Sequence, residues 1–358
     1  GICSYCHNSN VEKNEISARV GTFYPVLGRG LILNAYEDKN LGIDNSIDGT
    51  QFKYTSEWFS FKGLFGKFRP SHREEENTIG GGELRISPSD ELYIGWAYTN
   101  SELSIAKSVE LHSSIAGFSH DYFDFYGEYA FSNKTIAEYV LKAKPSDYDD
   151  GTHALYLTSN MYYESSNLLI EYKYYKNFYL YDNHNYDENV LTYNKPPTLI
   201  QDHKFSLPGR HGYTYGNDVS IEKGLTLKLD HPIGDNLYTT SFYNRTENGK
   251  GDLVFTESFL QIESTLFSDY ELTGLIGSQL YNDPFFFKEL SFKHVALNLV
   301  SSQFGLNYGL TVELQELSDN KSDKKGYSNF YIVELSKPSF ATVSFLFETY
   351  SGNYAKPG

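Results

Sequence analysis

Strict alternation of apolar and polar residues constrains this chain more than any other feature of its sequence. In residues 304–314 one face carries only apolar or aromatic side chains, namely Phe304, Leu306, Tyr308, Leu310, Val312 and Leu314. The other face carries Gly305, Asn307, Gly309, Thr311 and Glu313. A period of two predicts a β-strand with one apolar face, and about 9–11 residues suffice for a tilted strand to cross a bilayer.

The alternation recurs between short turn sequences such as His231–Asn236 and Asn248–Asp252. It predicts eight strands in the second part of the chain, near residues 218–230, 236–246, 254–267, 270–280, 290–301, 304–316, 326–336 and 340–350. Earlier strands are expected near residues 15–35 (one bent strand), 50–60, 61–68, 80–87, 91–99, 107–118, 121–132, 136–143, 152–163 and 167–180.

These strands predict an all-β fold, an antiparallel up-and-down transmembrane β-barrel of roughly 16–18 strands. Residues 1–14 would form a periplasmic N-terminal segment and residues 15–358 the barrel, with a long loop at 180–217. A soluble all-β sandwich would bury the same apolar faces equally well and stays open as an alternative. A propeller is disfavoured, because no blade repeat is visible.

Composition and charge exclude several classes of protein. The chain has 46 acidic against 30 basic residues and a formal net charge of −16, whereas a nucleic-acid surface needs clustered Lys and Arg. The longest apolar candidate, Phe285–Val300, is interrupted by charged residues, so no transmembrane helix is expected. No catalytic triad or calcium-loop spacing stands out, and we expect no enzymatic activity.

The sharpest motif is Cys3-Ser-Tyr-Cys6-His7, which uses both cysteines of the chain. C-x-x-C-H is the attachment pattern of c-type haem, in which two thiols bind the porphyrin and the histidine ligates the iron. The motif therefore predicts one covalent haem c on Cys3 and Cys6, with His7 as ligand to the haem iron. A local disulfide between Cys3 and Cys6, or half of a zinc site, remains open.

Residues 21–49 carry a second recognisable pattern, with Phe23-Tyr24, Gly28-Arg-Gly-Leu31, Leu41-Gly-Ile-Asp-Asn45 and Gly49. This series resembles the start of a family of large outer-membrane β-barrel proteins of unassigned function from Bacteroidota, although Leu27 replaces the usual Phe. The combination of a barrel with C-x-x-C-H is also similar to the porin–cytochrome conduits of metal-respiring bacteria. Some barrel subunits of those conduits carry an N-terminal C-x-x-C without haem, which the disulfide alternative would match.

Together these features predict a porin-like sheath of the bacterial outer membrane, with a periplasmic N-terminus, that takes part in electron transfer to the cell exterior. The expected partners are outer-membrane lipid and a multihaem cytochrome or other periplasmic or outer-membrane subunits. A polar lumen face including Lys228, Asn307 and Glu313 would contact solvent or the cytochrome. The alternatives are a diffusion channel or secretion-associated scaffold with a Cys3–Cys6 disulfide, and a soluble surface-exposed binding protein.

Overall fold

The computed structural model describes residues 14–38, 43–68, 77–103, 106–132, 152–176, 178, 203–209, 221–249, 251–267, 270–283 and 288–353. The chain divides into two compact units. Unit 1 comprises residues 1–159, 172–198 and 218–222, and unit 2 comprises residues 160–171, 199–217 and 223–358. Cys3, Cys6 and His7 lie outside the described residues, as do the expected strand at 136–143 and most of the expected loop at 180–217.

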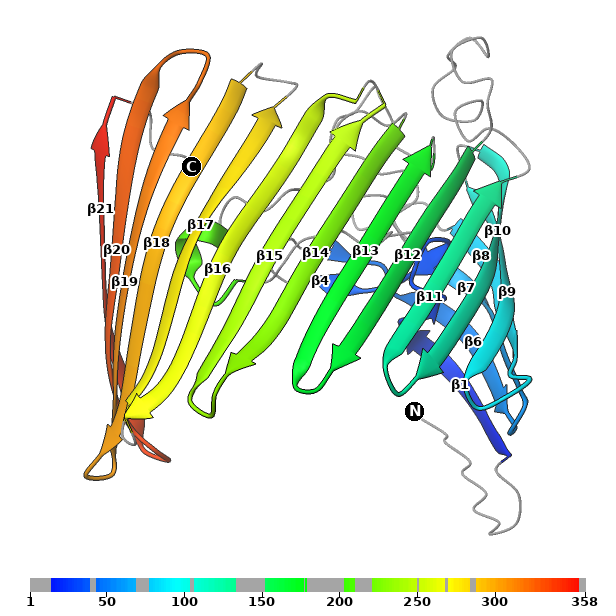
Figure 1. The fold of residues 1–358 in the computed structure, drawn as a ribbon. Coiled ribbons are helices and arrows are strands. Elements are labelled where there is room, and N and C mark those ends of the chain that lie inside the picture. Colours follow the sequence, from blue (N-terminus) through cyan, green and yellow to red (C-terminus); the bar gives the residue numbers. More distant parts are fainter. Residues whose placement is uncertain are drawn as a thin grey trace. The chain divides into compact units, whose positions relative to one another are not determined.

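Within the described ranges, hydrogen bonds join seventeen strands into one antiparallel sheet (Figure 1). The first nine of these strands are β1 (Glu15–Phe23), β6 (Ile47–Thr55), β7 (Phe59–Phe68), β8 (Asn77–Ile86), β9 (Leu92–Leu103), β10 (Ala106–His120), β11 (Phe123–Ser132), β12 (Thr152–Tyr163) and β13 (Ser166–Lys176). The other eight are β14 (Ile221–Ile233), β15 (Leu237–Asn248), β16 (Leu253–Phe267), β17 (Tyr270–Asp283), β18 (Lys288–Gln303), β19 (Leu306–Asp319), β20 (Lys324–Lys337) and β21 (Ala341–Gly352).

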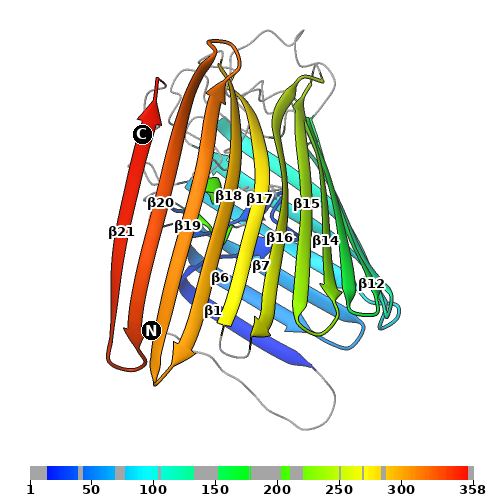
Figure 2. The ribbon, with the colours of Figure 1, turned by 60° about the vertical axis from the view of Figure 1, so that its left-hand side comes forward.

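The sheet follows chain order with one departure at its start. β1 pairs with β6, and Phe23 lies directly opposite Ile47. From β6 onward each strand is hydrogen-bonded to the next one in sequence. Figures 1 and 2 both show β16 to β21 side by side in this up-and-down order.

The all-β, up-and-down fold predicted from the alternation is thus confirmed. All eight strands expected between residues 218 and 350 are present. The bent strand expected at 15–35 is wrong, because β1 ends at Phe23 and the chain then leaves the sheet. Gly28 and Gly30 take positive φ angles of 57° and 91°, and Gly30 N–H donates to the Leu27 carbonyl at 2.9 Å, which closes a turn that a strand cannot contain.

The chain between β1 and β6, residues 24–46, is called the inner segment here. Its described part contains two short ribbons, β2 (Val26–Leu27) with β3 (Leu33–Asn34) and β4 (Glu37–Asp38) with β5 (Ile43–Asp44). Most of its described apolar side chains are buried, among them Leu27, Leu31 and Ile32, whereas Tyr24 and Val26 are 42% and 37% exposed. The face of the unit 1 sheet that contacts this segment is called the inward face of unit 1. The inward face of unit 2 is defined separately, as the face that contacts helix α2 (Ser206–Gly209).

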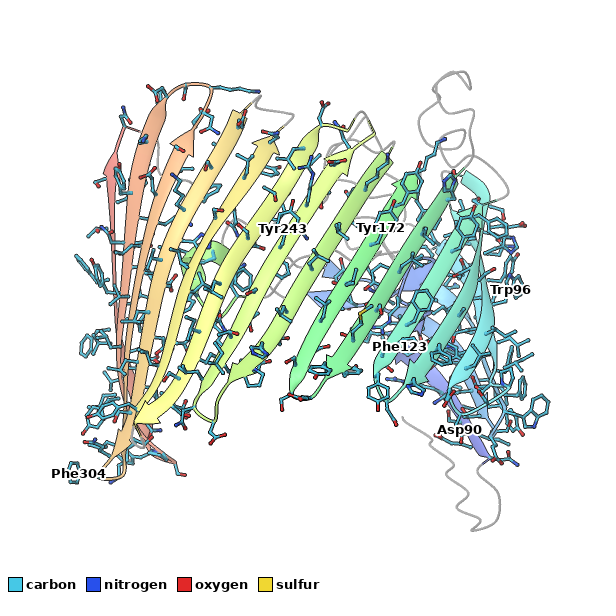
Figure 3. The ribbon with its side chains drawn as sticks, in the orientation of Figure 1. Asp90, Trp96, Phe123, Tyr172, Tyr243 and Phe304 are labelled. Atoms are coloured by element: carbon cyan, nitrogen blue, oxygen red, sulfur yellow. The ribbon has the colours of Figure 1, made fainter. Side chains whose placement is uncertain are left out.

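The opposite, outward face is apolar and exposed in both units. In unit 1 it carries Trp96, which projects from β9 (Figure 3). In unit 2 Ile276 and Leu297 are 59% and 45% exposed, whereas Gln279 and Glu313 on the inward face are each 2% exposed. At these positions the two faces reverse the distribution found in water-soluble sheets, which bury apolar and expose polar side chains.

Candidate functional site: two polar anchors on the inward face

The first anchor holds the turn at Gly28 of the inner segment against the unit 1 sheet. Gly28 N–H donates to Oε2 of Glu83 on β8 at 2.7 Å, and Arg29 N–H donates to Oε2 of Glu128 on β11 at 2.7 Å. Both carboxylates are buried, with exposures of 5% and 1%. Two backbone donors that have left the sheet thus find charged acceptors, which is the strong class of hydrogen bond.

Neighbouring side chains fix the Glu128 carboxylate in place. Oε1 accepts from the Ser113 hydroxyl at 2.8 Å, and Oε2 accepts from the Tyr126 hydroxyl at 2.5 Å. Glycine is required opposite, since a Cβ on Gly28 would lie 2.5 Å from both oxygens of Glu128. At the sequence Gly28-Arg29-Gly30 the backbone therefore approaches the buried Glu128 carboxylate closely.

Cations complete the charge balance of the first anchor. Arg85 forms an ion pair with Glu83, and its guanidinium lies 5.2 Å from the centre of the Tyr93 ring. Arg29 lies 5.0 Å above the Tyr126 ring. With two carboxylates engaged by backbone N–H groups and two guanidiniums stacked on aromatic rings, this cluster is suited to holding a segment rather than to proton transfer.

The second anchor holds residues 203–209, here called the strap, which include α2, against the inward face of unit 2. Glu313 on β19 accepts hydrogen bonds from Ser206 N–H at 2.9 Å and Leu207 N–H at 2.6 Å. Gln279 donates to the Pro208 carbonyl at 3.1 Å. Donors at the start of α2 and a carbonyl at its end are thus satisfied by side chains of the sheet, as a short buried turn requires.

The strap is also held by an apolar contact and two polar ones. Phe205 is buried in a cluster with Phe242, Phe259, Leu275 and Ala296. Nε2 of His203 lies 2.7 Å from Oε1 of Glu257, and the Lys204 ammonium lies 2.6 Å from Glu263. Gln279 donates to Glu257 as well, at 2.6 Å. The strap therefore packs on β15 to β18 through the side chains that precede α2.

The three residues expected on a polar lumen face all lie on inward positions of their strands. Lys228 forms an ion pair with Asp230 at 3.0 Å, Asn307 accepts from Ser302 at 2.7 Å, and Glu313 holds the strap. Sequence reasoning missed Glu83, Glu128 and Glu257 as anchors. The available signal was an acidic residue on the polar side of an alternating strand, which does not indicate what it binds.

The described part of the chain contains no group of three or more His, Cys, Asp or Glu side chains arranged to hold a metal ion. Among the same residues, no helix is long and apolar enough to cross a membrane.

Comparison with known proteins identifies a family without an assigned activity. Residues 4–229 match the model of DUF6029, a family of unknown function. No curated protein sequence matches the chain. Among solved structures it is similar to the siderophore receptor PirA from Acinetobacter baumannii, with a TM-score of 0.45 and 10% identity over 95% of this chain and 63% of the receptor chain. The chain thus spans less than two thirds of that receptor. Because the family model covers well over half of the sequence, the protein belongs to the DUF6029 family.

Proposed function

We propose that this protein is a porin-like β-barrel of the bacterial outer membrane whose inward face is partly covered by its own inner segment and strap. The observation that carries the proposal is the reversed polarity of the strands. Ile276 and Leu297 are exposed on the outward face, while Gln279 and Glu313 are buried on the inward one. Lipid is the solvent in which an exposed apolar face stabilises a sheet, and a polar interior is typical of outer-membrane barrels.

The length of the strands also supports a location in the membrane. The strands β14 to β21 have 12 to 16 residues each. A tilted strand needs about 9–11 residues to cross the hydrocarbon core. The strands are therefore long enough to cross it and to extend beyond it.

The arrangement of turns supports a periplasmic N-terminus. Glu15, at the start of β1, lies opposite Thr55 at the end of β6. The short turns at 56–58 and 87–91 thus lie at the same end of the unit 1 sheet as the beginning of β1. Outer-membrane barrels have short turns on the periplasmic side and longer loops outside.

A fractionation experiment tests the membrane proposal. We expect the full chain to stay with the outer membrane after a high-salt and carbonate wash, to require detergent for extraction, and to migrate faster on gels before heating than after it. The matched control is a periplasmic protein expressed in the same cells. Release of the chain by the wash, without detergent, would favour the soluble alternative.

A second proposal concerns electron transfer and is favoured by the sequence Cys3-Ser-Tyr-Cys6-His7. We propose that the two thiols hold one haem c, that His7 ligates its iron, and that the barrel works with a multihaem cytochrome rather than as an enzyme. A covalently attached haem supplies one-electron chemistry at the periplasmic end. The competing proposal is a diffusion channel or secretion-associated scaffold with a Cys3–Cys6 disulfide.

Haem staining and the intact mass of the denatured chain distinguish a covalent haem from a Cys3–Cys6 disulfide. Covalent haem predicts a stain that survives denaturation and disappears in Cys3→Ser and in Cys6→Ser. A mass lower by two hydrogens than that of the reduced chain, without stain, would establish the disulfide. Because cysteine-to-serine variants also remove the disulfide, His7→Ala serves as the control that leaves both thiols in place.

A further inference from the structure

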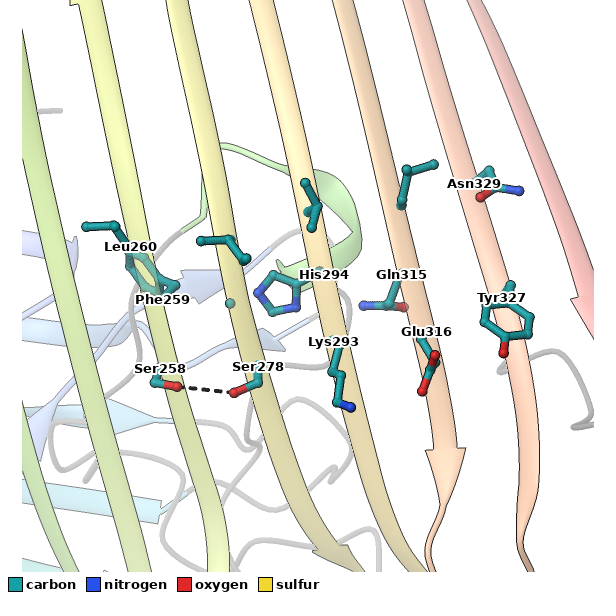
Figure 4. Close-up of a pocket in the computed structure, with 14 residues that line it drawn as sticks. Ser258, Phe259, Leu260, Ser278, Lys293, His294, Gln315, Glu316, Tyr327 and Asn329 are labelled. Carbon is teal, nitrogen blue, oxygen red and sulfur yellow. Dashed lines mark hydrogen bonds between the residues drawn. The ribbon is translucent and has the colours of Figure 1, made fainter.

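A groove of about 780 Å³ crosses β16 to β20 on the outward face of unit 2 (Figure 4). The strand registers line up two rows of its residues across the sheet. The polar row consists of Ser258, Ser278, Lys293, Glu316 and Tyr327. The adjoining row is apolar at Leu260, Ile276, Val295 and Leu314 and ends in the polar Asn329 on β20. The groove is therefore amphipathic, with a polar edge beside an apolar floor.

The polar row marks the level at which the outward face changes from polar to apolar side chains. Along β18 the outward positions change from Ser291 and Lys293 to Val295, Leu297 and Leu299. In a membrane-spanning sheet such a boundary coincides with the level of the lipid head groups, where long cationic side chains reach the interface.

Charge at this boundary favours an anion. The cross-strand partners of Lys293 are Ser278 and Glu316. The Glu316 carboxylate is shared, since Nζ of Lys325 lies 3.8 Å from its Oε1. Two ammonium groups thus flank one carboxylate on the outward surface of a chain whose net charge is −16, and of the two lysines Lys293 is the one that lines the groove. Hydroxyl groups lie on the same row, with Ser278 bonded to Ser258 at 3.1 Å.

We propose that this groove binds one anionic phospholipid. Its phosphodiester is held by the Lys293 ammonium and the hydroxyls of Ser278 and Tyr327, and an acyl chain lies along Leu260, Val295 and Leu314. A single local excess of positive charge matches one phosphodiester, whereas a glycolipid with several phosphates would need several cations. The site rests on the proposed membrane location of the protein.

Native mass spectrometry of the full chain in detergent micelles tests the site, with phosphatidylglycerol and phosphatidylcholine of equal chain length as probes. We expect the wild-type chain to retain one phosphatidylglycerol in preference to phosphatidylcholine. One lysine near a lipid surface contributes about 1 kcal/mol, so Lys293→Gln should weaken phosphatidylglycerol retention about fivefold. Retention of phosphatidylcholine should fall less, because its choline cation already offsets the charge of its phosphodiester. Lys324→Gln, on the same sheet but outside the groove, should retain the wild-type preference. Val295→Trp, which fills the apolar floor, should displace both lipids.

Several outcomes would overturn the site. They are equal retention of the two lipids by the wild-type chain, an equal effect of Lys293→Gln and Lys324→Gln, and displacement of phosphatidylglycerol by an equimolar phosphorylated glycolipid. Heat-modifiable gel mobility of each variant shows that it is folded. A chain that needs detergent and is heat-modifiable but shows no lipid preference refutes the lipid site alone. A chain that needs no detergent refutes the membrane proposal itself.

Discussion

The backbone N–H of Arg29 donates a 2.7 Å hydrogen bond to the carboxylate of Glu128, a residue 99 positions further along the chain. This contact joins the turn of the inner segment to the middle of β11. Because Glu128 also accepts from Ser113 and Tyr126, one buried carboxylate connects three separate parts of unit 1. The inner segment is consequently part of the fold of unit 1.

Replacement of Glu128 by Ala should destabilise unit 1. The substitution leaves the Arg29 N–H and two hydroxyls without their acceptor, and a hydrogen bond to a charged group contributes about 1.5–3 kcal/mol. We expect a loss of about 2–3 kcal/mol in the free energy of unfolding by urea in detergent micelles. Glu102→Ala, at an exposed position on β9, is the control and should change this free energy by no more than about 0.5 kcal/mol. Equal effects of the two substitutions would contradict the anchor.

Substitution of two glycines with similar backbone conformations separates the cost of backbone strain from the cost of a steric clash. Gly28 and Gly234 have φ angles of 57° and 65°, but only at Gly28 would a Cβ meet other atoms, those of Glu128 at 2.5 Å. Gly234→Ala should cost about 1–2 kcal/mol from conformation alone. Gly28→Ala should cost more, since the carboxylate must move as well. Urea unfolding of both variants measures the difference, and a smaller cost at Gly28 would show that the close approach is absent.

A charge on the outward face should be costly in lipid. Leu297 lies within the apolar part of β18, and Leu297→Arg should reduce the free energy of unfolding in phosphatidylcholine vesicles by about 2–4 kcal/mol. Phe304→Arg, in the exposed turn between β18 and β19 (Figure 3), should cost no more than about 1 kcal/mol. In a water-soluble sheet an arginine at either exposed position would be nearly neutral, so equal small effects would exclude a lipid-facing surface.

Loss of Glu313 should release the strap. Without its carboxylate the N–H groups of Ser206 and Leu207 lose their acceptor. We expect their amide hydrogen exchange to accelerate at least about tenfold in Glu313→Ala, which corresponds to about 1.4 kcal/mol. Glu316→Ala, on the same strand but facing outward, should leave these two amides unchanged. Unchanged exchange in Glu313→Ala would show that the other contacts of the strap suffice.

Alternation alone predicted the strands of unit 2 because every second residue there has the same environment. The same pattern placed Glu313 on the polar face, and the structure confirms it. What could not be predicted was the partner of that carboxylate, since the strap lies 106 positions earlier and has no periodic signal.

The start of the sheet shows where local reasoning fails. Gly28 and Gly30 interrupt an otherwise strand-like sequence, and glycine with positive φ is compatible both with a G1 bulge and with an exit from the sheet. The choice between them depends on Glu83 and Glu128, which are distant in sequence. Pairing of β1 with β6 depends in turn on that exit, so neither could be read from the residues around Gly28.

The register of β1 with β6 also makes the inner segment a modular insertion. Because Phe23 and Ile47 are direct partners, the segment leaves and rejoins the sheet at one point, as a hairpin turn does. A two-residue Asn-Gly connection between these positions would preserve the ladder while deleting everything in between. The pairing of β1 with β6 is therefore independent of what the inner segment contains, and a replacement segment needs only to begin at Phe23, end at Ile47 and supply donors to the buried carboxylates of Glu83 and Glu128.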